Sequence, residues 1–210
     1  MAEECARILL ANGADPNHRS PGYGRVSLLY AAIEMHRYGV ANAFIKYGAD
    51  VTSRMLSQPL SSLLHRADSQ CPRMGTSAVM HLAARRLPES SQTVRLLLAA
   101  GADVTVAQAK RLVRHKLIHG SAMQTLCFLR QSDYHLMDEL VKSLVDERLF
   151  SDHDVTSIDE LLSTTLTLQR LAANVIRRRL RPNALVGVKN LPLPPAFNHN
   201  FILLDGFLDF

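Results

Sequence analysis

Tryptophan is absent from this sequence, and aromatic residues make up only 6% of its 210 positions. β-sheet proteins are usually rich in aromatic and β-branched residues, whereas the leucine and alanine that dominate here favour helices. The apolar content of 47% is enough for a hydrophobic core, so the chain is not expected to be disordered. The composition therefore predicts a folded, all-α protein.

Cysteine is also scarce, since the chain contains only Cys5, Cys71 and Cys127. Their odd number and wide spacing argue against a disulfide framework. No run of about 18 apolar residues is present, so we expect no membrane span. The opening residues, MAEECARILL, lack the basic-then-apolar order of a signal peptide. We therefore expect reduced thiols and a cytoplasmic location, with the nucleus as the second candidate compartment.

Motifs of common enzymes are missing as well, since there is no glycine-rich phosphate loop and no Gly-x-Ser-x-Gly nucleophile elbow. Cys127 sits in an apolar run, so we interpret it as a core residue rather than a nucleophile. His115 and His119 have the four-residue spacing of a helical zinc site, but Lys116 stands where a zinc peptidase needs its glutamate. We interpret the two histidines as solvated or capping side chains, and we expect no catalytic residues, no metal and no cofactor.

The net charge of +5 and a pI near 9.4 raise the question of nucleic-acid binding. The positive residues occur in short groups, one of which lies on a predicted helix and comprises Lys110, Arg111, Arg114 and Lys116. Interleaved aromatic residues are missing from this group. A solvated face, or a contact with an acidic partner, is the simpler interpretation.

A short phrase occurs three times: Leu-Leu-Ala-Asn-Gly-Ala-Asp at 9–15, Ile-Lys-Tyr-Gly-Ala-Asp at 45–50 and Leu-Leu-Ala-Ala-Gly-Ala-Asp at 97–103. Each copy is typical of the end of an amphipathic helix. The glycines are expected to adopt the left-handed conformation that ends a helix; they are Gly13, Gly48 and Gly101. The aspartates are expected to accept hydrogen bonds from backbone amides in the following turn; they are Asp15, Asp50 and Asp103.

The first two copies are 35 residues apart, which is close to the ankyrin period. Residues 26–32 (Val-Ser-Leu-Leu-Tyr-Ala-Ala) and 78–84 (Ala-Val-Met-His-Leu-Ala-Ala) are similar to the Thr-Pro-Leu-His-x-Ala-Ala opening of an ankyrin repeat. The chain thus resembles the ankyrin family, which implies a solenoid of helix pairs with short β-turn fingers and a surface that binds a target protein. The resemblance points to five target-binding residues: Tyr23, Arg25, Glu34, His36 and Arg37.

Two features depart from a regular ankyrin array. The second and third copies are 53 residues apart, and the surplus holds a further opening-like segment at 58–64 and a polar segment at 68–75. An insertion around 51–75 or a degenerate repeat would each explain this spacing. The chain also begins with an expected second helix at 3–12, as in a fragment that lacks earlier repeats. Ile8, Leu9 and Leu10 are therefore expected at an uncapped end of the solenoid.

After the third copy, helical spacing continues at 107–118, 120–131 and 134–149. We assign the ankyrin repeats to 1–131 and a helical bridge to 132–164. A final helix then carries an apolar face at positions i, i+3, i+4, i+7 and i+8, namely Leu168, Leu171, Ala172, Val175 and Ile176. Arginines at 177–179 and Pro182 mark its end. Taken alone, this apolar face would be expected to pack on the last repeat.

A second short helix is predicted at 183–190, followed by an extended Leu-Pro-Leu-Pro segment. Together, residues 165–206 resemble the three-helix SOCS box. The elongin C element of that family reads Ser/Thr-Leu-x-x-x-Cys-x-x-x-Ile, which Thr167, Leu168 and Ile176 match. The cullin-5 element of the family is matched letter for letter by Leu191, Pro192, Leu193 and Pro194. The resemblance implies that the apolar face binds a groove of elongin C, with Leu168 as the anchor.

Three departures from the SOCS pattern leave the strength of elongin binding and the choice of cullin open. Ala172 stands in place of cysteine, Phe197 in place of leucine, and Asn200-Phe201 in place of Tyr-Leu.

The resulting hypothesis is a non-catalytic substrate-recognition adaptor of an elongin B/C–cullin-5 RING E3 ubiquitin ligase. The alternative is an ankyrin protein–protein interaction scaffold whose degenerate SOCS box recruits no ligase. A third hypothesis, an ankyrin protein that associates with nucleic acid, rests only on the positive charge. The target protein cannot be predicted, because a fold does not name its ligand.

Overall fold

A computed structural model describes residues 2–18, 27–52, 90–116, 121–132, 137–146, 168–180 and 182–192, together with positions 158, 160 and 163. Its helices are α1 (Ala2–Ala11), α2 (Leu28–Glu34), α3 (Tyr38–Lys46), α5 (Ser91–Ala99), α6 (Val106–Arg114), α7 (Ala122–Ser132), α8 (Met137–Asp146), α10 (Leu168–Arg179) and α11 (Ala184–Lys189). Within these ranges no strand occurs, so the prediction of an all-α protein is confirmed.

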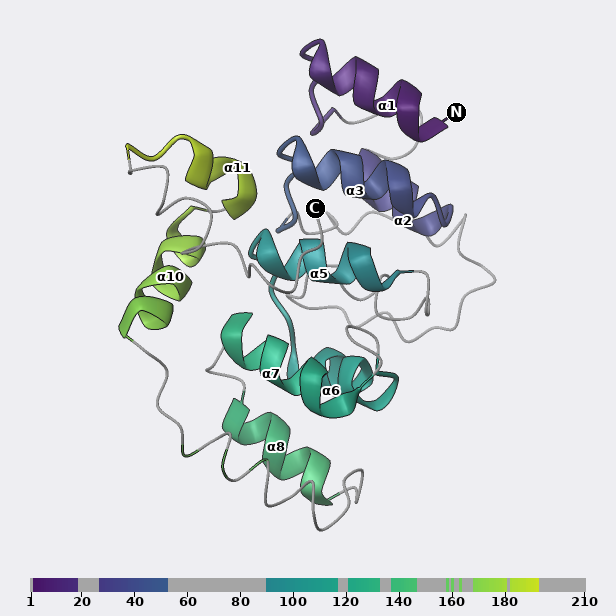
Figure 1. The fold of residues 1–210 in the computed structure, drawn as a ribbon. Helices are drawn as coiled ribbons and strands as arrows, with labels where there is room; N and C mark the ends of the chain where they lie inside the picture. Colours follow the sequence, from purple (N-terminus) through teal and green to yellow (C-terminus); the bar gives the residue numbers. More distant parts are fainter. Residues whose placement is uncertain are drawn as a thin grey trace.

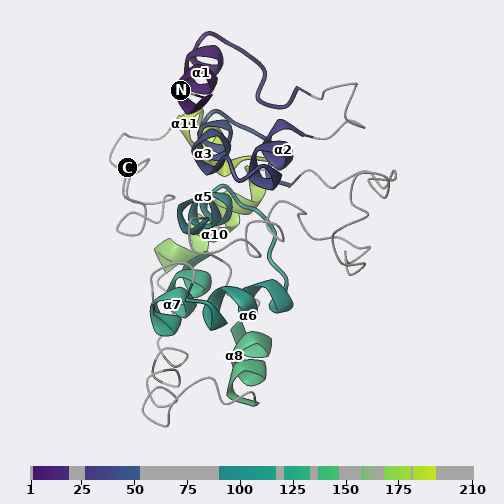
Figure 2. The same cartoon turned by 90° about the vertical axis from the view of Figure 1, so that its right-hand side faces the viewer.

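The helices are arranged in a stack. Figure 1 shows α1, α3, α5 and α7 following one another down the molecule, and Figure 2 shows α2 and α6 in a second column beside them. The last two helices, α10 and α11, lie beside the stack, next to the carboxyl ends of α3 and α5 (Figure 1). α11 therefore contacts α3, which is more than a hundred residues earlier in the chain.

The three Gly-Ala-Asp copies end their helices in the same way. Gly13, Gly48 and Gly101 have φ angles of 89°, 100° and 92°. In each copy the glycine amide donates to the carbonyl three residues earlier, and the next alanine amide donates to the carbonyl five residues earlier, at 2.9–3.2 Å. This pair of bonds satisfies carbonyls that the helix end leaves without partners. The predicted left-handed helix stops are confirmed.

The turns that follow two of these stops also form as predicted. The carboxylate of Asp15 accepts a hydrogen bond from the Asn17 amide at 2.8 Å, and that of Asp50 accepts one from the Thr52 amide at 2.8 Å. The side chain of Asn17 then links the two turns, since its Oδ1 accepts from the Asp50 amide at 2.7 Å. The first two turns are thus tied to each other along the stack.

α3 and α5 are adjacent layers, although their glycine stops are 53 residues apart. Asn42 of α3 joins them, because its Oδ1 accepts from the Thr93 hydroxyl at 2.7 Å and its Nδ2 donates to Gln92 at 3.3 Å. α3 and α5 therefore contact each other directly. The segments at 58–64 and 68–75 lie outside the described residues.

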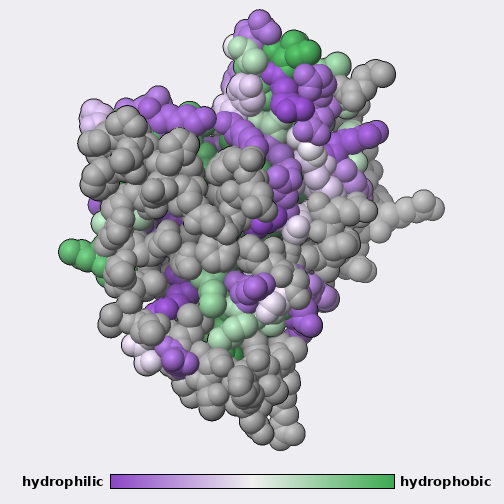
Figure 3. All heavy atoms as spheres, viewed as in Figure 1, coloured by the Kyte–Doolittle hydropathy of each residue, from purple (hydrophilic) through white to green (hydrophobic). Residues whose placement is uncertain are grey.

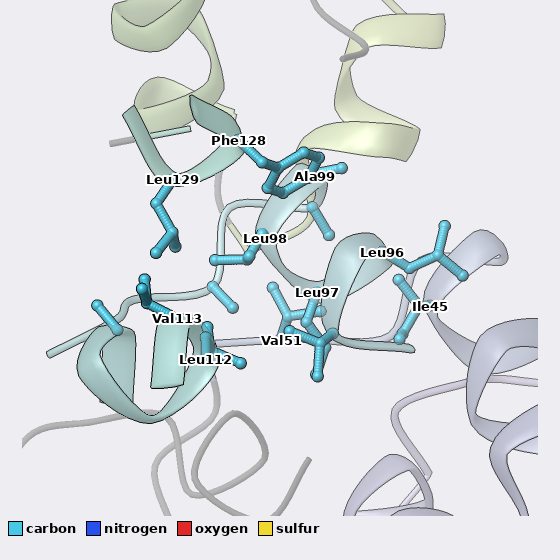
Figure 4. Close-up of a cluster of buried hydrophobic side chains, with 14 of the residues drawn as sticks. Ile45, Val51, Leu96, Leu97, Leu98, Ala99, Leu112, Val113, Phe128 and Leu129 are labelled. Carbon is cyan, nitrogen blue, oxygen red and sulfur yellow. The ribbon is translucent and has the colours of Figure 1, made fainter. Parts of the chain in front are cut away.

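The core is centred on α5, whose side chains are buried on both sides of the helix. Figure 4 shows Leu96, Leu97, Leu98 and Ala99 between two groups of partners. One group comprises Ile45 and Val51, and the other comprises Leu112, Val113, Phe128 and Leu129. Because α5 is covered from above and below, it holds the two halves of the stack together.

The first helix lies at the end of the stack and is largely exposed. Ile8 and Leu9 are 54% and 62% exposed, as expected for an uncapped end. Leu10 is only 6% exposed, so the prediction for this residue is wrong. α1 packs on α3, and that contact covers one side of α1 only.

The predicted helix at 107–118 is too long at its C-terminal end. α6 ends at Arg114, and Lys116 has a φ of 53°, which a continuing α-helix does not allow. The helices predicted at 120–131 and 134–149 are observed as α7 and α8. Among the described helices none is long and apolar enough to cross a membrane.

Candidate partner-binding site on α10

The helix that carries the predicted apolar face forms where the sequence places it. α10 runs from Leu168 to Arg179 and carries three arginines in its last turn. The amide of Leu180 still donates to the Ile176 carbonyl at 3.0 Å, and the chain leaves the helix before Pro182. A proline has no amide hydrogen and ends helices, so the boundary follows from the sequence.

The apolar face of α10 points away from the protein. Leu168 is 83% exposed and Val175 is 57% exposed, while Leu171, Ala172 and Ile176 are partly buried. Figure 3 shows hydrophobic atoms projecting at the edge where Figure 1 places α10. Amphipathic helices of globular proteins normally turn this side toward the core. The expectation that the apolar face packs on the last repeat is therefore not met.

The side of α10 that faces the protein is polar instead. Ala173 is fully buried, and Asn174 and Arg177 are each 3% exposed. The guanidinium of Arg177 donates to the side-chain oxygen of Asn174. Burying an arginine is costly unless it is hydrogen-bonded, and this bond within α10 satisfies one of the guanidinium donors. The usual orientation of an amphipathic helix is reversed.

α11 forms where a second short helix was predicted at 183–190, and it begins at a cap that the sequence analysis did not single out. Asn183 precedes α11, and its side-chain oxygen accepts from the Leu185 amide at 3.1 Å. Its Nδ2 donates to the carbonyls of Ile45 and Ala49 at 2.8 and 2.9 Å. An Asn between a proline and an apolar run is a recognisable helix-cap signal. The carbonyl partners at the end of α3 have no local signal, because they are 138 and 134 residues away.

The predicted cullin-binding segment is described only at its start. Leu191 is half-buried and Pro192 is exposed directly after α11. Leu193, Pro194 and Phe197 lie outside the described residues, as do Asn200-Phe201 and Thr167 of the elongin element. The described part of the site therefore consists of α10, α11 and the first residues after them.

Three of the five predicted target-binding residues share the turn after α2. His36 and Arg37 are exposed, and Glu34 is half-buried at the end of the helix. His36 has a φ of 57°, and its ring lies edge-on to that of Tyr38, with the ring centroids 6.1 Å apart. The other two predicted residues, Tyr23 and Arg25, lie outside the described residues.

The other chemical candidates from the sequence gain no support as reactive sites. His115 is exposed and follows the last residue of α6, so helical i, i+4 spacing to position 119 does not apply; His119 itself is not described. No group of three metal-ligating side chains occurs in the described part of the chain. Burial raises the pKa of the Cys127 thiol above its ordinary value, although the nearby charge of Arg130 opposes this shift. A protonated thiol is a poor nucleophile, which agrees with the interpretation of Cys127 as a packing residue.

The basic group on α6 is a solvent-facing surface, as the sequence predicts. Arg111, Arg114 and Lys116 are exposed and Lys110 is half-buried. The opposite side of α6 is apolar and packs in the core, and the helix itself contains no aromatic residue.

Comparison of the chain with protein-family models, with curated proteins and with solved structures finds no match.

Proposed function

We propose that this chain is the substrate-recognition adaptor of an elongin B/C–cullin-5 RING E3 ubiquitin ligase. In this function α10 binds elongin C, the segment at 191–194 contacts cullin-5, and the helical stack holds a target protein. The ligase chemistry belongs to the partners, so the chain carries no catalytic residue. A cytoplasmic site of action, with the nucleus as second candidate, is part of the same proposal.

The observation that carries the proposal is the reversed orientation of α10. Leu168 is the most exposed large apolar side chain among the described residues, at 83%. Burial of such a side chain stabilises a protein by roughly 1.5–3 kcal/mol. The isolated chain lacks this stabilisation, because Leu168 remains in contact with solvent. A partner with an apolar groove recovers this free energy, as in other complexes where a helix lies in a groove. The elongin-type spacing of Leu168, Ala172 and Ile176 identifies the partner we propose.

The stack supports the target-binding half of the proposal. The same unit of helix, left-handed glycine and aspartate turn recurs in it, and consecutive turns are linked by the side chain of Asn17. α2 and α3 are neighbouring helices joined by a short turn, as in an ankyrin repeat. Solenoids of this kind bind proteins through the surfaces that their turns and inner helices present. We place the target on the surface that includes His36 and Arg37.

The test is co-expression of the full chain with elongins B and C, followed by purification through a tag on elongin B. The wild-type chain is expected to copurify. Leu168→Asp is expected to remain in the unbound fraction, because a carboxylate cannot enter an apolar groove without a partner. Leu9→Asp is the matched control, since Leu9 is also an exposed leucine on a helix but lies on α1. Absence of the wild-type chain from the purified complex would refute the proposal.

One observation favours the alternative, an ankyrin scaffold that recruits no ligase. Ala172 occupies the position where the SOCS pattern has cysteine, and it is partly buried on α10. Its methyl group reaches less far than a thiol, so the apolar face is shallower at its middle. If elongins do not bind, α10 remains an exposed apolar surface on a protein-binding stack.

A further inference from the structure

One side chain at the start of α11 contacts the stack and uses both ends of its amide to do so. Asn183 is 5% exposed at the start of α11. Its Nδ2 donates to the carbonyls of Ile45 and Ala49, at 2.8 and 2.9 Å, across the end of α3. Its Oδ1 accepts from the Leu185 amide at 3.1 Å and so caps α11. One residue thus begins α11 and ties it to α3.

A second contact joins α11 to the next layer of the stack. The amide of Ala184 donates to the carbonyl of Ala100 at 2.9 Å, directly before the glycine stop of α5. A Cβ at Gly101 would lie 4.0 Å from the Ala184 methyl group, and one at Gly48 would lie 3.3 Å from Val186. The start of α11 therefore rests on the glycine stops of two adjacent layers.

The chemistry of these stops explains why they can hold another element. Ala49 and Ala100 follow the last residues of α3 and α5, so their carbonyls are not bonded within a helix, and a buried carbonyl without a hydrogen bond is costly. Glycine leaves room for close approach, since a Cβ added at Gly48 would crowd Val186. The stop at Gly13 differs, because a Cβ placed there would meet nothing within 4 Å.

We propose that Asn183 is a positioning residue that fixes α10 and α11 relative to the stack. With this attachment in place, Asn174 and Arg177 stay against the protein and the apolar face of α10 stays outward. Without it, the tether between α11 and α3 is lost, and α10, which precedes α11 directly, can turn its apolar face toward other surfaces. The consequence for ligase assembly rests on the proposed function, since a fixed α10 sets the orientation of the ligase relative to a bound target.

The test is a distance distribution measured by pulsed electron paramagnetic resonance on the full chain. Spin labels are placed at Arg111 on α6 and Arg179 on α10, which are both exposed. The native cysteines are replaced (Cys5→Ser, Cys71→Ser and Cys127→Ala). We expect one narrow distance peak in this background. Asn183→Asp is expected to replace it with a broad distribution, because Asp retains the cap acceptor of α11 but loses both donors to α3.

The control is Asn190→Ala, which removes an exposed amide at the other end of α11 and is expected to keep the narrow peak. Asn183→Ala, which also removes the cap, is expected to broaden the distribution at least as much as Asn183→Asp. A narrow, unshifted peak in Asn183→Asp would overturn the inference. The measurement needs no elongin, so a failure of this inference is distinguishable from a failure of elongin binding.

Discussion

Leu168 and Arg177 belong to the same helix, and the leucine faces solvent while the arginine is buried. Their exposed fractions are 83% and 3%, the reverse of what their side chains would favour in an isolated folded chain. Arg177 is held by Asn174, and the helix that follows is held by Asn183. The side of α10 that contains Arg177 faces the protein, and the apolar face is left exposed for a partner.

Replacing a helix-stop glycine is expected to reveal how α11 is docked. Gly48→Ala and Gly13→Ala both force alanine into the left-handed region, at a cost of roughly 1–2 kcal/mol each. Gly48→Ala is expected to cost more, because its new Cβ lies 3.3 Å from Val186 while that of Gly13→Ala meets nothing within 4 Å. Urea unfolding monitored by circular dichroism measures the free energy of unfolding of both variants. An equal decrease in the free energy of unfolding of the two variants would contradict the docking of α11 on the stop of α3.

The N-terminus of α6 is expected to depend on its capping box. The Thr105 hydroxyl accepts from the Gln108 amide at 3.3 Å, and the Gln108 side chain accepts from the Thr105 amide at 3.0 Å. Thr105→Ala should lower the free energy of unfolding by about 1 kcal/mol, whereas Thr105→Ser retains the acceptor and should change it little. Thermal or urea unfolding distinguishes the two variants. A Ser variant as unstable as the Ala variant would argue against the cap.

Cys127 is expected to react more slowly with iodoacetamide than the exposed Cys5 at pH 8. Burial raises the pKa of Cys127, so less of its thiol is ionised at that pH, and its partial burial also limits access. Mass spectrometry after timed alkylation measures each site. Faster reaction at Cys127 would show that its thiol is more ionised or more accessible than the structure indicates.

The same pKa shift predicts how stability changes at alkaline pH. Above the ordinary thiol pKa of 9.0, the unfolded chain loses the Cys127 proton while the folded chain keeps it. The folded state then binds more protons than the unfolded state, so the free energy of unfolding falls as pH rises through this range. Cys127→Ala should remove that part of the alkaline decrease, as urea unfolding at pH 8 and pH 10 would measure. An identical decrease in the variant would contradict the shift.

Ala172→Cys tests whether the departure from the SOCS pattern weakens elongin binding. The thiol extends the middle of the apolar face, so we expect tighter binding of elongins B and C, by about tenfold if roughly 1.4 kcal/mol is gained. Calorimetric titration compares the variant with the wild type, and Ala172→Ser is the control of similar size with a polar group. If Cys and Ser act alike, the apolar contact at this position is not what limits affinity.

The local features of the fold were predictable from the sequence, and the long-range ones were not. A glycine followed by Ala-Asp specifies a helix stop through its own backbone, so the stops at Gly13, Gly48 and Gly101 form as expected. Lys116 adopts a left-handed conformation without being glycine, which is why the end of α6 was placed too late. Leu10 is buried in a helix that packs on α3, and the sequence around Leu10 does not reveal that long-range contact.

For the candidate site, periodicity predicted which residues of α10 share a face but not which way that face points. Its direction depends on Asn183 reaching carbonyls 134 and 138 residues away, and no local pattern reports such a contact. The residues on the inward side of α10 gave a partial indication that this side is polar. Asn174 and Arg177 are three positions apart, a spacing at which polar side chains on a helix can bond to each other.

The most direct test of the account is calorimetric titration of elongin B/C into purified wild-type chain, Leu168→Asp and Leu9→Asp. We predict saturable binding to the wild type and to Leu9→Asp. A loss of at least about 2 kcal/mol, or roughly 30-fold in affinity, is predicted for Leu168→Asp, because one anchor carries much of such an interface. Binding that is absent in the wild type, or unchanged by Leu168→Asp, would contradict the assignment of α10 as the elongin-binding helix.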